Sequence, residues 1–191
     1  IIKPVARLVG TKNPLVIAHR GVSSEAPENT LAAYSLAWKL KFDAIEIDVR
    51  RTKDSFFVCS HDNNLNRVSL NKKSISSMLL SEITEVDIGS WKSKKYKDER
   101  MPLLSKVLST IPKEKKVFIE IKGALKEIDQ LISIVKKSKI KIRDCHFLSY
   151  IPANIKKIKK EFPDFKATLN TIPAFYNYEI CLLYTSPSPR D

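Results

Sequence analysis

The stretch Ile45-Glu46-Ile47-Asp48-Val49 decides the fold, because it sets two carboxylates inside a run of β-branched residues. Such a run is typical of a buried strand, where polar side chains cost free energy unless they are satisfied. The pattern recurs in Ile17-Ala18-His19-Arg20-Gly21, Phe57-Val58-Cys59-Ser60-His61 and Val117-Phe118-Ile119-Glu120-Ile121-Lys122. Four interrupted runs of this kind predict one site that the strands share.

Strand and helix patterns alternate along the chain around these runs. Strands are predicted at 15–18, 44–49, 56–60, 117–121, 145–148 and 166–169, and helices at 29–40, 103–111, 125–137 and 153–162. Asn29 is the expected N-cap of the first helix. This alternation predicts parallel β/α units, and polar residues at strand ends favour a TIM-type (β/α)8 barrel. A doubly wound sheet is the alternative fold, although the sequence has no glycine-rich nucleotide loop.

Two segments depart from the alternation. Residues 62–101 are polar but carry apolar anchors, so we expect a small insertion after the third strand. These anchors are Leu79, Leu80, Ile83, Val86, Ile88 and Trp91. Residues 181–191 resemble a translated sequencing adapter and are expected to be an artefactual tail. We therefore expect residues 1–180 to form an incomplete barrel with about six of the eight strands.

Composition narrows the function classes. The formal net charge is +13 and 43% of the residues are hydrophobic, with no apolar run long enough to cross a membrane. The charge can steer an anionic substrate or contact phospholipid headgroups, or it is simply a lysine-rich solvated surface. No nucleic-acid-binding motif accompanies it, so no nucleic-acid partner is expected. Cys59 and Cys145 are expected to be buried free thiols, which favours a reducing compartment such as the cytoplasm. The chain begins at Ile1 rather than Met, so the compartment is left open.

The carboxylates have a spacing that suits a metal. Glu46 and Asp48 lie two residues apart on one strand, so both side chains point to the same face. In a barrel this face is the interior, and Glu120 and Lys122 point inward by the same parity. Three convergent carboxylates need a counter-charge, and a hard cation such as Mg²⁺ or Ca²⁺ suits an all-oxygen set. The alternative is a network of carboxylates, lysine and arginine without metal.

His19 and His61 each follow a strand, which places both imidazoles at the mouth of the barrel. Two imidazoles can act as base and acid in one displacement. Arg20 and Lys122 supply positive charge suited to a phosphate. His146 follows Cys145 inside a strand without acidic neighbours, so we expect a structural role for it.

Taken together, these motifs resemble the glycerophosphodiester phosphodiesterase family from about Leu15 to Leu169. The matching segments are His19-Arg20-Gly21, Pro27-Glu28-Asn29-Thr30, Glu46-Ile47-Asp48-Val49, Thr52-Lys53-Asp54, His61-Asp62, Asp87-Ile88-Gly89-Ser90-Trp91, Met101-Pro102-Leu103-Leu104 and Glu120-Ile121-Lys122. The resemblance implies a TIM barrel that hydrolyses glycerophosphodiesters to glycerol 3-phosphate and an alcohol, with a divalent metal.

The resemblance also implies roles for single residues. Glu46, Asp48 and Glu120 would hold the metal, His19 and His61 would be the acid/base pair, and Arg20 and Lys122 would bind the phosphate. In the mechanism proposed for such enzymes, the glycerol 2-hydroxyl attacks phosphorus, expels the alcohol and leaves a cyclic phosphate that water opens.

Three departures from the family pattern lie away from these groups: Ser105-Lys106, Val68 and Tyr150. They leave the preferred alcohol open. Two alternative functions also stay open: a phospholipase D-like activity on lysophospholipids or sphingomyelin, and an inactive barrel that binds a phosphate ligand. The expected partner is a small-molecule phosphodiester substrate, and membrane contact and oligomeric state are left open.

Overall fold

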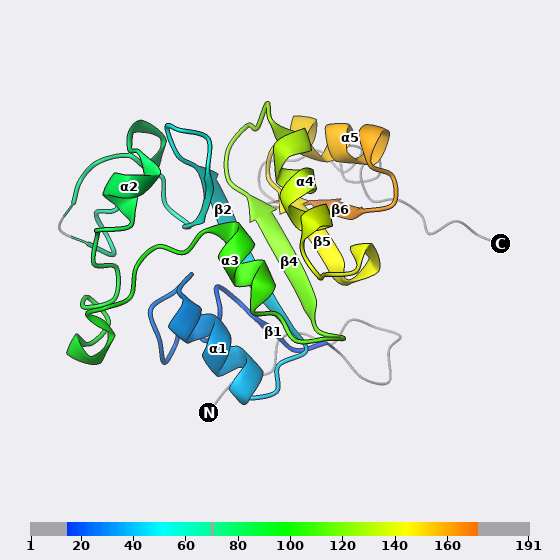
Figure 1. Cartoon of the computed structure of the whole chain (residues 1–191). Coiled ribbons are helices and arrows are strands. Elements are labelled where there is room, and N and C mark those ends of the chain that lie inside the picture. The colour runs from blue at the N-terminus through cyan, green and yellow to red at the C-terminus, as the bar shows by residue number, and fades with distance from the viewer. Residues whose placement is uncertain (1–14, 70, 172–191) are drawn as a thin grey trace.

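A parallel sheet covered by helices on one face frames the molecule in the computed structural model, which describes residues 15–69 and 71–171 (Figure 1). Five of the described strands run in the order β1-β2-β4-β5-β6, and every neighbouring pair is parallel. They are β1 (Ile17–Ala18), β2 (Ala44–Arg51), β4 (Lys116–Ile121), β5 (Cys145–Ser149) and β6 (Lys166–Leu169). The predicted parallel β/α architecture is therefore confirmed.

The third predicted strand belongs to the six-stranded sheet of the described residues but not to its parallel series. β3 (Phe57–Cys59) pairs antiparallel with β2, off the main path of the sheet. Residues 52–56 make a tight turn between the two strands, in which Thr52 N–H donates to the Phe56 carbonyl at 2.9 Å. A connection this short permits only an antiparallel return, because a parallel crossover needs a dozen or more residues.

The longer helices fill the connections between the parallel strands. These are α1 (Leu31–Lys39), α3 (Leu104–Ser109), α4 (Ile128–Lys137) and α5 (Pro152–Glu161). Shorter helical turns are α2 (Leu80–Ile83), η1 (Ile75–Ser77), η2 (Lys94–Tyr96) and η3 (Ile142–Asp144). The N-cap of α1 is Thr30 and not the expected Asn29, since the Thr30 hydroxyl accepts from Ala33 N–H at 3.2 Å. The Asn29 side chain therefore does not cap this helix.

The two faces of the sheet differ in polarity. On the face under the helices, Ile45, Ile47, Val117, Ile119 and Phe147 are fully buried and belong to one apolar core. The alternate residues point to the opposite face and include the three carboxylates predicted to form the site. The register sets Asp48 beside Glu120 on adjacent strands. Side-chain parity therefore assigns the core to one face and the chemistry to the other.

The segment predicted to be an insertion has a small core of its own. Its buried apolar residues are Leu65, Ile75, Met78, Ile83, Ile88 and Met101, and Val58 of β3 packs with them. An isolated bridge between Val58 and Leu103, and a 3.0 Å hydrogen bond from Cys59 N–H to the Pro102 carbonyl, close its base. In Figure 1 this segment, with α2, lies beside the sheet on the side away from β5 and β6. Two expected anchors, Leu79 and Trp91, are exposed instead.

Within the described residues, Cys59 and Cys145 are free and buried, as expected. Cys181 and the predicted tail 181–191 lie outside that part of the chain. Over residues 15–69 and 71–171, no helix combines the length and apolar character that crossing a membrane requires.

Candidate active site

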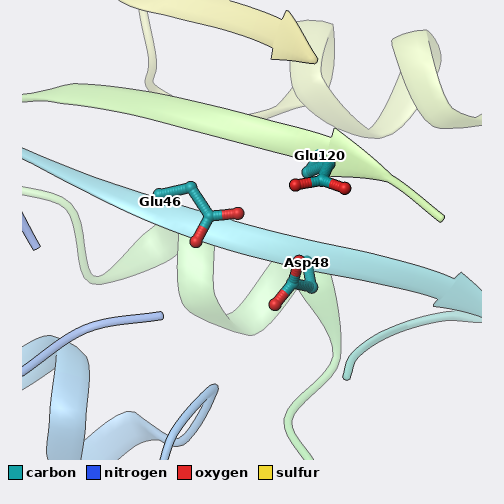
Figure 2. Close-up of side chains that lie close together, drawn as sticks. All are labelled: Glu46, Asp48 and Glu120. Atoms are coloured by element: carbon teal, nitrogen blue, oxygen red, sulfur yellow. The ribbon is translucent and has the colours of Figure 1, made fainter. Parts of the chain in front are cut away.

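Three carboxylates converge on the polar face of the sheet, as their parity predicted. Glu46 and Asp48 come from β2 and Glu120 from the adjacent β4 (Figure 2). All three are buried, and one oxygen from each lies within 4.8 Å of the others. Three buried anions this close repel one another unless a positive charge lies among them.

The oxygens of these carboxylates fit a divalent cation. Glu46 Oε2 accepts from the Arg20 backbone N–H at 3.0 Å, whereas the buried Glu46 Oε1 has no hydrogen bond. Asp48 Oδ1 is likewise buried without a hydrogen bond. Burial, and then the charge of Asp48, raise the pKa of Glu46 to about 8. Buried acceptors without partners call for an explanation, and an oxygen-binding ion such as Mg²⁺ or Ca²⁺ supplies one.

Both predicted phosphate-binding cations lie against this cluster. Lys122 Nζ is 3.1 Å from Asp48 Oδ1 and 2.5 Å from Glu120 Oε1. Arg20 Nε is 3.2 Å from Asp48 Oδ2. These ion pairs are the metal-free network considered as the alternative. They satisfy part of the cluster only, because Glu46 Oε1 has no hydrogen bond and Lys122 does not meet Asp48 Oδ1 in hydrogen-bond geometry.

Asn29 fixes the orientation of Asp48, a role that the sequence analysis missed. Its backbone is left-handed, with φ at 56°, and its side chain is buried. The amide donates to Asp48 Oδ2 at 2.8 Å, while its oxygen accepts from the Asp48 N–H at 3.2 Å and from the Tyr34 hydroxyl at 2.7 Å. Asparagine tolerates this backbone region better than most residues. An asparagine between Glu28 and Thr30 could therefore have indicated a left-handed residue before the helix.

The two predicted catalytic histidines differ in the contacts of their rings, and within the described residues only His19 forms an ion pair with the cluster. His19 is largely exposed, and its Nε2 lies 3.9 Å from Glu46 Oε2. Partial burial of the ring, followed by the charge of Arg20, lowers the pKa of His19. His61 Nδ1 lies 2.7 Å from Asp62 Oδ1. When Nδ1 carries the proton toward this carboxylate, Nε2 of His61 is left as an acceptor.

A chain of ion pairs connects the loops that carry Arg20 and His61. Arg67 donates from Nε to Asp62 Oδ2 at 2.7 Å, and from Nη1 and Nη2 to the two Glu28 oxygens at 2.6 and 2.8 Å. Glu28 in turn accepts from Arg20 Nη1 at 3.0 Å. Burial alone would raise the pKa of Glu28, but the hydrogen bonds and charge of Arg67 outweigh it and lower that pKa. Sequence reasoning missed Glu28 and Arg67 because they lie 39 residues apart.

His146 occupies the same face of the sheet but has uncharged partners. Its Nε2 lies 2.8 Å from the Thr168 hydroxyl, and its ring stacks on Phe118 at 5.2 Å between centroids. Burial, with the charges of Lys166 and Lys159, lowers the pKa of His146 to about 4. These contacts support the structural role expected for it.

Comparison with known proteins places the chain in a family. The model of the glycerophosphoryl diester phosphodiesterase family matches residues 19–174. A glycerophosphodiester phosphodiesterase of Caldanaerobacter subterraneus subsp. tengcongensis is 35% identical over 160 residues, covering 81% of this chain and 65% of that protein. One from Bacillus subtilis is 34% identical over 117 residues, covering 57% and 40%.

Solved structures show the same fold. A glycerophosphodiester phosphodiesterase from Agrobacterium tumefaciens has a TM-score of 0.75 at 29% identity, covering 81% of this chain and 66% of that one. An Oleispira antarctica phosphodiesterase in complex with the product sn-glycerol-3-phosphate has a TM-score of 0.78 at 30% identity, covering 83% and 66%. The described parallel strands are part of a TIM-type barrel. The chain spans between 40% and 66% of the length of these four proteins. The chain belongs to the glycerophosphoryl diester phosphodiesterase family.

Proposed function

We propose that this member of the family hydrolyses glycerophosphodiesters and releases glycerol 3-phosphate and an alcohol. The observation that carries the proposal is the buried cluster of Glu46, Asp48 and Glu120, which includes two carboxylate oxygens without any hydrogen bond. Arg20 and Lys122 lie beside this cluster, so positive charge is available for a phosphodiester. The Oleispira relative with bound glycerol 3-phosphate supports this choice of substrate.

Each proposed role follows from chemistry and position. Glu46, Asp48 and Glu120 would hold Mg²⁺ or Ca²⁺, which when bound neutralises charge that builds on the phosphoryl oxygens. Arg20 and Lys122 add fixed positive charge at the same place, where exclusion of water strengthens its effect. We propose either metal, since both prefer oxygen ligands.

Proton transfer falls to the two imidazoles. One histidine accepts the proton of the glycerol 2-hydroxyl as the hydroxyl oxygen bonds to phosphorus. The other histidine protonates the leaving alcohol oxygen as the bond between that oxygen and phosphorus breaks. The resulting cyclic phosphate is opened by water with the proton roles reversed. Asp62 holds Nδ1 of His61 and so keeps its Nε2 available for this exchange.

The test is release of glycerol 3-phosphate by the protein expressed with its complete open reading frame. Glycerophosphocholine and lysophosphatidylcholine serve as paired substrates, each with and without EDTA. We expect hydrolysis of the former, loss of activity in EDTA, and recovery with Mg²⁺ or Ca²⁺. Preference for lysophosphatidylcholine would establish the phospholipase D-like alternative, and turnover of neither would favour the inactive phosphate-binding barrel. Full activity in EDTA, with metal content near zero, would refute the roles of the three carboxylates.

A further inference from the structure

A large cavity shares Lys122 with the proposed metal site, although none of the three carboxylates lines it. It has a volume of about 700 Å³ and lies where β2 and β4 end, walled by the connection over residues 122–127 and by Asn63 and Ser76 of the insertion. Lys122 lines the cavity and also lies 3.1 Å from Asp48 Oδ1. A phosphodiester held at the metal site can therefore extend one of its two ester groups into this space.

The lining of the cavity is strongly cationic. Its charged side chains are Arg50, Arg51, Lys53, Lys122, Lys126 and Glu127. The single carboxylate is already engaged, because Glu127 Oε1 lies 3.5 Å from Arg51 Nη2. Arg50 donates from Nε and Nη2 to the neutral His61 carbonyl, at 2.9 and 2.6 Å.

Lys53 and Lys126 form no ion pair within the described residues, where the paired cations of this kind are Arg20, Arg51, Arg67 and four other lysines. Lys53 and Lys126 therefore leave positive charge on the cavity wall, whereas the charges of Asp48, Asp62 and Glu120 already act on Arg50. A quaternary ammonium group needs a carboxylate or an exposed aromatic face. The lining offers only the engaged Glu127 and the buried Phe57 for that purpose.

We propose that this cavity receives the alcohol moiety of the diester and selects alcohols that carry a second negative charge, such as a phosphate monoester. The inference rests on the proposed function, which supplies the phosphodiester at the metal site. Arg20 and Lys122 are engaged with the central phosphate and the carboxylates. Lys53 and Lys126 remain to attract the additional charge, and electrostatic complementarity of this kind sets specificity.

The experiment must separate this local effect from the overall charge of +13, which attracts any anion. Lys113 and Lys115 provide the matched control, because they line a different cavity near the amino end of β4. The double variants Lys53→Ala/Lys126→Ala and Lys113→Ala/Lys115→Ala remove the same two charges. Lys53→Arg/Lys126→Arg keeps both charges at the cavity and tests for rescue.

The full-length protein and each variant are assayed with three diesters of glycerol 3-phosphate. Their alcohols are choline, glycerol and glycerol phosphate, which are cationic, neutral and anionic. We expect kcat/KM to rise along this series. The ratio of kcat/KM for the anionic to the choline diester should fall about tenfold in Lys53→Ala/Lys126→Ala, as expected for two partly exposed charge pairs. It should stay within twofold of wild type in the control and in the arginine variant.

Each other outcome has a definite meaning. Equal kcat/KM for the three diesters would overturn the inference and leave the proposed function standing. An equal fall of the ratio in Lys113→Ala/Lys115→Ala would also overturn it, because overall charge would then explain the preference. Turnover of none of the diesters would overturn the proposed function together with the inference.

Discussion

The polar face of the sheet has two halves, which differ in how far their polar groups are satisfied by hydrogen bonds. On β2 and β4, Glu46, Asp48 and Glu120 lie among cations, and a buried oxygen is left without a hydrogen bond. On β5 and β6, His146 lies on the same face of the sheet and contacts a hydroxyl and an aromatic ring. The first half gathers charge that a ligand can complete, whereas the second satisfies its polar groups internally. The role of a histidine on this face therefore depends on the residues that surround its imidazole.

The largest expected effect tests that assignment directly. Replacing His61 or His19 by alanine should lower kcat by at least ~10²-fold, the usual scale for a lost general acid or base. His146→Ala should leave kcat within a factor of about two, since its partners are uncharged. Steady-state kinetics on the full-length protein measure all three variants. A severe loss in His146→Ala together with a mild one in His61→Ala would reverse the roles of the two halves.

A smaller effect is expected from the residue that holds Asp48. Asn29→Gly keeps the left-handed backbone but removes both side-chain contacts to Asp48, so Mg²⁺ affinity should fall roughly 10- to 100-fold, as for other lost supporting contacts. Thr168→Val is the matched change in the other half and should leave Mg²⁺ affinity unaltered. Isothermal titration of the metal into each full-length variant measures this. Equal affinities for wild type and Asn29→Gly would show that Asp48 needs no such support.

The smallest effect concerns stability and pH. The folded pKa of His146, about 4, lies below the ordinary 6.5, so the unfolded state binds the proton first as pH falls. The stability from a neutral His146 is therefore complete above pH 6.5 and is lost progressively down to about 4. His146→Gln should reduce the pH dependence of the unfolding free energy over this window by roughly 1 kcal/mol, after allowance for solvent around the ring. Urea titrations at several pH values measure it, and parallel curves for both proteins would contradict it.

The sequence was sufficient to predict which face of a strand each side chain occupies, because the periodicity of the strand controls it. The alternation inside Ile45-Glu46-Ile47-Asp48-Val49 was enough to place two carboxylates on one face, and the structure brings Glu120 beside them. The roles of these residues in binding a metal stay a prediction. Periodicity carries no information on pairing direction, and for that reason β3 was counted as parallel although its turn allows only the antiparallel return.

The sequence pattern did not predict contacts between segments that are distant along the chain. Asn29 was predicted as a helix cap because asparagine is common there, yet Thr30 takes that place and Asn29 contacts Asp48. Arg67 gave no signal in the sequence, because an arginine in a polar segment is ordinarily solvated. Its bonds to Glu28 and Asp62 depend on how the insertion folds over the site.

The closed base of the insertion has a consequence for chain entropy during folding. Pairing β2 with β4 joins Ala44 to Lys116, a separation of 116 − 44 = 72 residues. The bridge from Val58 to Leu103 spans 103 − 58 = 45 of them, so an insertion that collapses first leaves 72 − 45 = 27 residues of open chain. Since closure entropy grows with the logarithm of loop length, this order lowers the cost of the central parallel pairing by about 1 kcal/mol. An insertion that collapses first would thus speed the strand pairing with the largest sequence separation in the described sheet.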